Sequence, residues 1–467
     1  MVLKLFNSLG RKLQEFAPIK AGEVRMYTCG PTVWNYAHVG NFRTFVFQDV
    51  LRRHLEFKGY RVTQVMNITD VEDKIIKGIR ETGKSLRELT DFYTAAFIAD
   101  LDALRIERPE RLARATEHMD AMLALIRTLR DRGLAYRSAD GSWYFSVSKF
   151  KAYGALSGVK LGSQRAAGRV SADHYEAKKV AADFAVWKAW VPDDGEVFWE
   201  TEFGKGRPGW SLECSAMSMK YLGETFDIHT GGIDLRFPHH ENEIAQSESA
   251  TGKKFVHYWL HSEFLSVGGA EMHKSAGNFV TFRDLREDGW DPLTIRLFLI
   301  SARYRDPVDL TAKALDQARS QRARVQELVS RLRALARGGG KGSGAPGPFL
   351  RDFEAAMDDD LNTPKAISAL LAFVRESNAL ADSGELGAEG AASILGALGK
   401  VNSVLGVIDF DEDVLEPRLQ ELLRTRDEAR KKKDFAESDR LRKELLAAGV
   451  VVEDTPGGTR WKRAGRG

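Results

Sequence analysis

Two cysteines and one short helical pair could together hold a metal ion. The chain has two cysteines, Cys29 and Cys214, which are far apart in the sequence. His239 and Glu243 would lie i and i+4 on one face of a helix, whereas His240 points elsewhere and is interpreted as structural. Two thiolates, an imidazole and a carboxylate form a zinc-binding set. Alternatively, both cysteines are buried apolar residues; without a Cys-x-x-Cys pair, spacing alone does not decide.

A small-residue turn, His38-Val39-Gly40-Asn41, could bind a nucleotide. It separates an expected strand end from an expected helix start, where backbone N–H groups and the helix dipole favour phosphate. The glycine permits close approach of the nucleotide to the backbone. A four-residue match of this kind also occurs by chance.

A glycine-rich loop, "GGAEMHKSAGNF", places Lys274 beside Ser275. The lysine could neutralise charge on a transferring phosphate. Taken alone, the loop is better interpreted as a surface loop with a solvated lysine.

The elements around these residues are typical of a parallel α/β sheet. Segments 23–30 and 61–69 read as buried strands, and segment 42–60 has helical periodicity that ends at Gly59. Strand, helix, strand is a βαβ unit, which binds ligands at the carboxyl ends of its strands. Cys29 falls at one such end, and Asn67, Thr69 and Asp70 fall at the next.

Composition is that of an ordinary globular protein. The 467 residues contain 43% hydrophobic and 29% charged residues, with a net charge of +3, which does not by itself require a nucleic-acid partner. Two cysteines exclude a disulfide framework. No window approaches the ~20 apolar residues of a membrane span, and no signal-peptide pattern begins the chain. We therefore expect a cytoplasmic protein without membrane contact.

The composition and the hydrophobic periodicity of the sequence change along the chain and predict five segments. They are an α/β part over 1–130, an insertion over 131–205, a second α/β part with the Lys-Ser loop over 206–310, a helical bundle over 311–410, and a C-terminal part over 411–467 in which a basic helical run leads into a short strand. "GGGKGSGAPGP" is expected to be a flexible linker.

Together these motifs resemble a class I aminoacyl-tRNA synthetase. Long stretches such as "YTCGPTVWNYAHVGN", "FDIHTGGIDLRFPHHENEIAQ" and "MDDDLNTPKAISAL" narrow the resemblance to the bacterial cysteinyl-tRNA synthetases. The resemblance implies a class I Rossmann-like core with an insertion, then a helical bundle and a small α/β domain. It also implies a monomer that joins L-cysteine to tRNA(Cys) through cysteinyl-adenylate, with ATP and Mg²⁺.

The resemblance also implies roles for individual residues. Zn²⁺ would be held by Cys29, Cys214, His239 and Glu243 and would recognise the thiol of the substrate. ATP would be bound by His38, Gly40, Asn41, Lys274 and Ser275. The cysteine pocket would include Cys29, Gly30, Thr69, Trp210 and His229. The C-terminal domain would read the anticodon, with tRNA contacts from Arg426, Arg430, Lys431, Lys432 and Trp461. Without the resemblance, the basic run is a solvated helix face.

The sequence departs from the family at one loop. The usual Lys-Met-Ser-Lys-Ser motif here reads Glu271-Met272-His273-Lys274-Ser275. A carboxylate near triphosphate oxygens is unfavourable by Coulomb's law unless it turns to solvent. We favour a loop in which Lys274 dominates; the alternatives are a slow enzyme and a paralogue that has lost activation. Two other functions stay open, a ligase joining cysteine to a small amine and a non-catalytic tRNA- or zinc-binding module.

Overall fold

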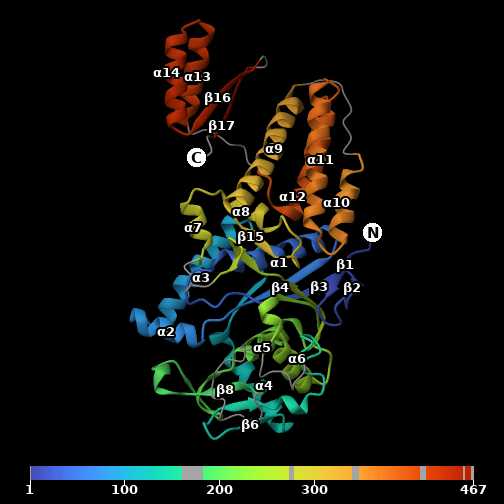
Figure 1. The fold of residues 1–467 in the computed structure, drawn as a ribbon, viewed down its shortest axis with the longest axis vertical. Coiled ribbons are helices and arrows are strands. Elements are labelled where there is room, and N and C mark those ends of the chain that lie inside the picture. Colours follow the sequence, from blue (N-terminus) through green and yellow to red (C-terminus); the bar gives the residue numbers. More distant parts are fainter. Residues whose placement is uncertain are drawn as a thin grey trace. The chain divides into compact units, whose positions relative to one another are not determined.

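The structure is a computed structural model that describes residues 2–159, 182–272, 278–338, 347–410, 417–455 and 458–463. Its contacts divide the chain into two compact units. The first comprises 1–285 and 291–408, and the second comprises 286–290 and 409–467. Figure 1 shows the elements of each unit.

A parallel sheet forms the centre of the first unit (Figure 1). Within the described residues its order is β12 (Val256–Ser262), β11 (Phe226–Gly232), β3 (Glu23–Thr28), β4 (Arg61–Ile68) and β5 (Arg111–Arg114). Thr28 pairs with Met66 on one side and with Thr230 on the other, so these strands end along the same edge. The two strands expected from the sequence are therefore neighbours, and the residues that follow them meet.

Helices connect and cover this sheet. The helix expected over 42–60 is α1, which begins at Val39 because His38 caps its first turn. The other helices of this part are α2 (Asp73–Thr82), α3 (Leu86–Ala103), α4 (Met119–Asp131), α5 (Trp210–Leu222) and α6 (His239–Thr251).

The insertion contributes an antiparallel sheet. In the described part its order is β6 (Ala135–Arg137), β7 (Trp143–Phe145), β8 (Phe184–Ala189), β10 (Gly204–Pro208) and β9 (Trp199–Thr201). Trp187 is fully buried and packs with Phe145 and Leu212, which belongs to α5. The insertion therefore shares a hydrophobic core with the helix that carries Cys214.

Short elements and a helical bundle complete the first unit. The short elements are β1 (Lys4–Asn7), β2 (Lys12–Glu15), β13 (Leu265–Val267), β14 (Ala270–Glu271), β15 (Val308–Leu310), α7 (Phe282–Glu287) and α8 (Pro292–Leu299). The bundle helices are α9 (Ala312–Arg337), α10 (Phe349–Asp358), α11 (Thr363–Asp382) and α12 (Ala388–Leu405). Arg296 of α8 is fully buried, pairs with Asp49 of α1 and donates to the Leu405 carbonyl, which ties the bundle to the catalytic part.

The second unit is a helical hairpin against a two-stranded ribbon. Its elements are α13 (Pro417–Lys431), α14 (Phe435–Ala447), β16 (Val450–Thr455) and β17 (Gly458–Arg463). Leu445, Val450 and Val452 form its small core. The mixed α/β architecture predicted from the sequence is confirmed.

Candidate active site

Four buried side chains converge at the ends of the parallel strands. The ligand atoms of Cys29, Cys214, His239 and Glu243 all lie within 4.8 Å of one another. Cys29 directly follows β3, Cys214 is on α5, and the other two share one face of α6. The sequence could not show that these four side chains come together, because their contact depends on how α5 and α6 pack against the sheet.

The donor atoms of this cluster fit a divalent cation. Oε1 of Glu243 is buried, lies 3.2 Å from Nε2 of His239 and has no hydrogen-bond partner. Nδ1 of His239 is 3.3 Å from the hydroxyl of Ser211, which leaves Nε2 directed at the cluster. A cation would compensate this buried set of donors, which is otherwise costly to desolvate. Two thiols, an imidazole and a carboxylate are zinc ligands by type.

Burial shifts the pKa of every member of the cluster towards its neutral form. Burial raises the pKa of the Cys29 thiol, raises that of Cys214 well above its ordinary value, and raises that of Glu243 to about 8. Burial also lowers the pKa of His239 to about 4. Without a cation the site is therefore neutral, and binding a metal would release protons from the thiols.

A second possible ligand set, Cys29, His229, His240 and Glu243, overlaps the first. Its imidazoles are already engaged. Nε2 of His229 lies 2.9 Å from Oε2 of Glu243, and His240 bridges Sγ of Cys29 at 3.3 Å and His261 at 2.8 Å. The first set therefore fits better. Helical spacing places His240 off the face that His239 and Glu243 share and predicts a structural role; its contact with Cys29 arises from tertiary packing, which that spacing does not encode.

Gly30 and Thr69 line the strand ends beside the cluster. A Cβ on Gly30 would lie 2.0 Å from the backbone oxygen of Asn67, so only glycine fits there. Thr69 donates its hydroxyl to Oε2 of Glu213 at 3.0 Å. Glu213 is 1% exposed, and sequence reasoning did not select it.

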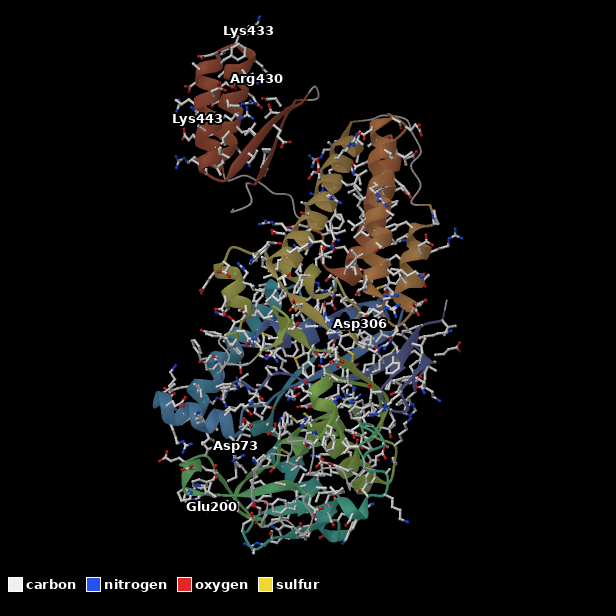
Figure 2. All side chains as sticks on the ribbon, viewed as in Figure 1. Asp73, Glu200, Asp306, Arg430, Lys433 and Lys443 are labelled. Carbon is white, nitrogen blue, oxygen red and sulfur yellow. The ribbon has the colours of Figure 1, made fainter. Side chains whose placement is uncertain are left out.

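A cavity of 540 Å³ opens next to the cluster. Trp210, Ser211 and Glu213 line it from α5, and residues of β8 and β10 line it from the insertion. Asp73, labelled in Figure 2, is also on its wall. The centres of the Trp210 and His239 rings are 4.1 Å apart, so this wall of the cavity contacts a candidate ligand.

The His38 turn is built as a helix N-terminus. Nδ1 of His38 accepts from the backbone N–H of Asn41 at 3.2 Å, and Oδ1 of Asn41 accepts from that of His38 at 3.1 Å. This reciprocal cap fixes both side chains at the positive end of α1. A Cβ on Gly40 would lie 2.8 Å from Met272. The turn therefore touches the start of the Lys-Ser loop.

The far flank of that loop also docks on the turn. The backbone N–H of Val39 donates to Val280, and the ring of His38 is 5.3 Å from that of Phe279. Lys274 and Ser275 lie outside the described residues.

The basic residues of the second unit differ in exposure. Arg426 is 1% exposed and forms a two-pronged ion pair with Asp454, so its guanidinium holds α13 to β16. This placement differs from the phosphate contact expected from the sequence, which stays a prediction that tRNA binding would test. Trp461 is half-buried against the small core of the unit.

The other cations of this unit are available to a partner. Lys431 and Lys432 are exposed, and Arg430 is half exposed while pairing with Asp454 at 2.8 Å. Figure 2 labels Arg430, with Lys433 and Lys443, on the α13–α14 hairpin.

Family models match three consecutive parts of the chain. The class I (C) tRNA synthetase catalytic domain matches 15–320, the DALR domain matches 352–409, and the cysteinyl-tRNA ligase anticodon-binding domain matches 412–461. A cysteine–tRNA ligase of Koribacter versatilis is 44% identical, covering 99% of this chain and 100% of that protein. One of Solibacter usitatus is 45% identical with the same coverage.

The chain belongs to the cysteine–tRNA ligase family. The resemblance inferred from the sequence is thereby confirmed, including its class I catalytic domain. Among solved structures, a methionyl-tRNA synthetase of Mycobacterium tuberculosis in complex with methionyl-adenylate aligns with a TM-score of 0.61 at 15% identity, covering 82% of this chain and 90% of that one. This likeness shows the shared fold. Among the described residues of this family member, no helix is long and apolar enough to cross a membrane.

Proposed function

We propose that this chain joins L-cysteine to tRNA(Cys) in two steps. The carboxylate of cysteine attacks the α-phosphate of ATP, giving cysteinyl-adenylate and pyrophosphate, and a terminal ribose hydroxyl of the tRNA then takes the aminoacyl group. The observation that carries the proposal is the convergence of Cys29, Cys214, His239 and Glu243 at the sheet edge, in a member of the cysteine–tRNA ligase family.

The four converging side chains would hold one Zn²⁺. When bound, zinc would lower the pKa of a substrate thiol and thereby favour cysteine over serine, whose hydroxyl stays protonated. An ordinary pocket separates such isosteres by only ~1–3 kcal/mol. His229 orients Glu243, and Ser211 orients His239. These two contacts would hold the ligands in place before the substrate arrives.

The remaining site residues would place the two small substrates. His38, Gly40 and Asn41 would present the N-terminus of α1 to ATP, accompanied by Mg²⁺, and Lys274 and Ser275 would close over the phosphates. Gly30, Thr69, Trp210 and His229 would line the cysteine pocket together with Cys29. Positioning and charge stabilisation would supply most of the rate acceleration.

The C-terminal part would bind the tRNA. Phosphates would meet Arg430, Lys431 and Lys432, and Trp461 would stack an unpaired base with its exposed face. The match to an anticodon-binding model over 412–461 supports tRNA over a small amine as the acceptor. We also propose that the protein is a cytoplasmic monomer with segment boundaries at 130, 205, 310 and 410.

ATP–pyrophosphate exchange tests the first step directly. Purified protein would be assayed with cysteine, with serine and without amino acid, and its zinc content measured in parallel. We expect cysteine-dependent exchange, no serine signal and about one zinc per chain. Exchange without zinc would overturn the role of the four ligands. Zinc without exchange would overturn the activation step and favour a paralogue disabled at Glu271.

A further inference from the structure

Three aromatic side chains gather on one surface of the catalytic part. Tyr36 lies 6.1 Å from Phe92 and 5.3 Å from Tyr93, and the last two rings are 5.1 Å apart. Phe92 and Tyr93 are on α3, whereas Tyr36 precedes the His38 turn. We call Tyr36, Phe92 and Tyr93 the aromatic platform.

Phe92 faces solvent, unlike Phe97 of the same helix, whereas Tyr36 and Tyr93 are half-buried. Phe92 is 49% exposed, whereas Phe97, on the other face of α3, is 3% exposed and packs at 5.1 Å against Phe45. Single exposed apolar side chains are common on protein surfaces, but clustered aromatic rings indicate a binding site. Packing in the hydrophobic core therefore accounts for Phe97 but not for Phe92, whose ring lies at the surface.

Two cations lie over the rings of the platform. Nζ of Lys84 is 5.0 Å from the centre of the Phe92 ring, and the guanidinium of Arg283 is 4.6 Å from that of Tyr36. Of the carboxylates nearby, Asp91 pairs with Arg114 at 2.6 Å, and Asp100 pairs with Arg283 at 3.1 Å and compensates part of its charge. Aromatic rings beside cations suit an unpaired nucleotide, because its base can stack on a ring and its phosphate can pair with a cation.

The platform is continuous with the proposed nucleotide site. Tyr36 is on the segment that joins Cys29 to His38. Arg283 is on α7, just after Thr281, whose backbone pairs with that of His38. Tyr36 is therefore two residues from the His38 turn, where the terminal ribose of the tRNA would meet the adenylate. Figure 1 shows α3, which carries Phe92 and Tyr93, and α1, which begins shortly after Tyr36.

We propose that the aromatic platform stacks an unpaired nucleotide of the tRNA 3′ strand, with Lys84 and Arg283 at its phosphates. The inference rests on the proposed function, because it takes tRNA as the acceptor. A protein partner fits less well, since three rings offer far less than the roughly 800 Å² per partner of a stable protein interface.

Binding of two tRNAs tests the proposal, one intact and one lacking its unpaired 3′ nucleotides. Phe92→Leu keeps an apolar side chain and removes the ring, whereas Phe92→Trp keeps a ring. We expect Phe92→Leu to raise the Kd for intact tRNA about tenfold, Phe92→Trp to stay near wild type, and neither to change the Kd for shortened tRNA. Lys84→Gln should reduce the salt dependence of binding to intact tRNA.

Leu13→Ala is the matched control, because Leu13 is an exposed apolar side chain at 44% on the remote β2 and should leave both Kd values unchanged. The proposal would be overturned if Phe92→Leu changed the Kd for both tRNAs equally or for neither. A change in oligomeric state instead of tRNA binding would also overturn it. Failure of the proposed function is separate: wild-type protein would then show no cysteine-dependent exchange or bind neither tRNA.

Discussion

Nε2 of His229 lies 2.9 Å from Oε2 of Glu243, and both side chains are fully buried. Burial lowers the pKa of His229 to about 3, so its imidazole is neutral, and once a cation holds Glu243 ionised, Nε2 would carry the proton and donate to Oε2. The bond leaves the other oxygen of Glu243 free to bind a cation. His229 is therefore a positioning residue for a proposed metal ligand.

Replacing His229 should weaken metal binding without removing a ligand. We expect His229→Ala to lower zinc affinity by about 10- to 100-fold, since the bound carboxylate loses its orienting partner. Competition with a chromogenic chelator measures this affinity. His257→Ala, on β12 and partly exposed, is the control and should bind zinc like the wild type. Unchanged affinity in His229→Ala would show that Glu243 needs no support.

Glu213 should act as a neutral hydrogen-bond acceptor for Thr69. Burial raises the pKa of Glu213 well above its ordinary value, which favours the protonated carboxyl. Glu213→Gln should therefore keep kcat/KM for cysteine within about threefold, whereas Glu213→Ala should lower it about tenfold by freeing the Thr69 hydroxyl. Exchange kinetics at varied cysteine give these values. If Gln were as harmful as Ala, the negative charge itself would be required.

Metal-free protein should lose stability as the pH rises from 7 to 8. Glu243 has a folded pKa of about 8, raised by burial from the ordinary 4.5, so the folded state keeps a proton that the unfolded state has released. Through this proton, Glu243 lowers the free energy of unfolding by about 1 kcal/mol as the pH rises from 7 to 8, and the decrease levels off above the folded pKa. The lowered pKa values of His239 and His229 give a small slope of opposite sign, which fades as the unfolded histidines lose their protons above pH 7.

Thermal unfolding of chelator-treated protein at the two pH values measures this effect. Glu243→Gln removes this titrating group and should show a smaller difference in unfolding temperature between the two pH values, the remainder coming from Glu213, whose pKa burial also raises. A wild-type slope equal to that of Glu243→Gln would contradict the assignment.

The carboxylate at Glu271 should slow activation. Glu271→Lys adds positive charge to the loop that would face the triphosphate, and we expect kcat/KM for ATP to rise about two- to tenfold. The exchange assay at varied ATP measures the change. Glu287→Lys has the same charge change on the exposed end of α7 and should leave the rate unaltered. An equal or lower rate in Glu271→Lys would mean that the loop does not need this charge.

In the second unit, substitution of Arg426 should affect stability, whereas substitution of Lys432 should affect tRNA binding. Arg426→Ala leaves Asp454 without its main partner and should lower the Tm of this unit by about 5 °C or more. Lys432→Ala should leave the Tm unchanged and weaken tRNA binding, with a smaller salt dependence. Calorimetry and tRNA titration distinguish the two. Weaker tRNA binding at unchanged Tm in Arg426→Ala would restore its expected phosphate contact.

The sequence by itself determined the fold class, the family and the residue types of the site. Strand periodicity placed Cys29 and Thr69 at strand ends, and helical spacing placed His239 and Glu243 on one face of α6. These features are local, because they depend on side-chain alternation and on turns of the backbone. The start of α1 was missed, since the His38 cap depends on its own side-chain geometry.

Only the tertiary structure decided which residues meet. The sequence could not show that His240 touches Cys29, that Glu213 accepts from Thr69, or that Phe92 stands outside the core. It also suggested a phosphate contact for Arg426, which the structure buries against Asp454. Burial and long-range pairing arise from the packing of elements distant in the chain, and neither residue type nor spacing encodes that packing locally.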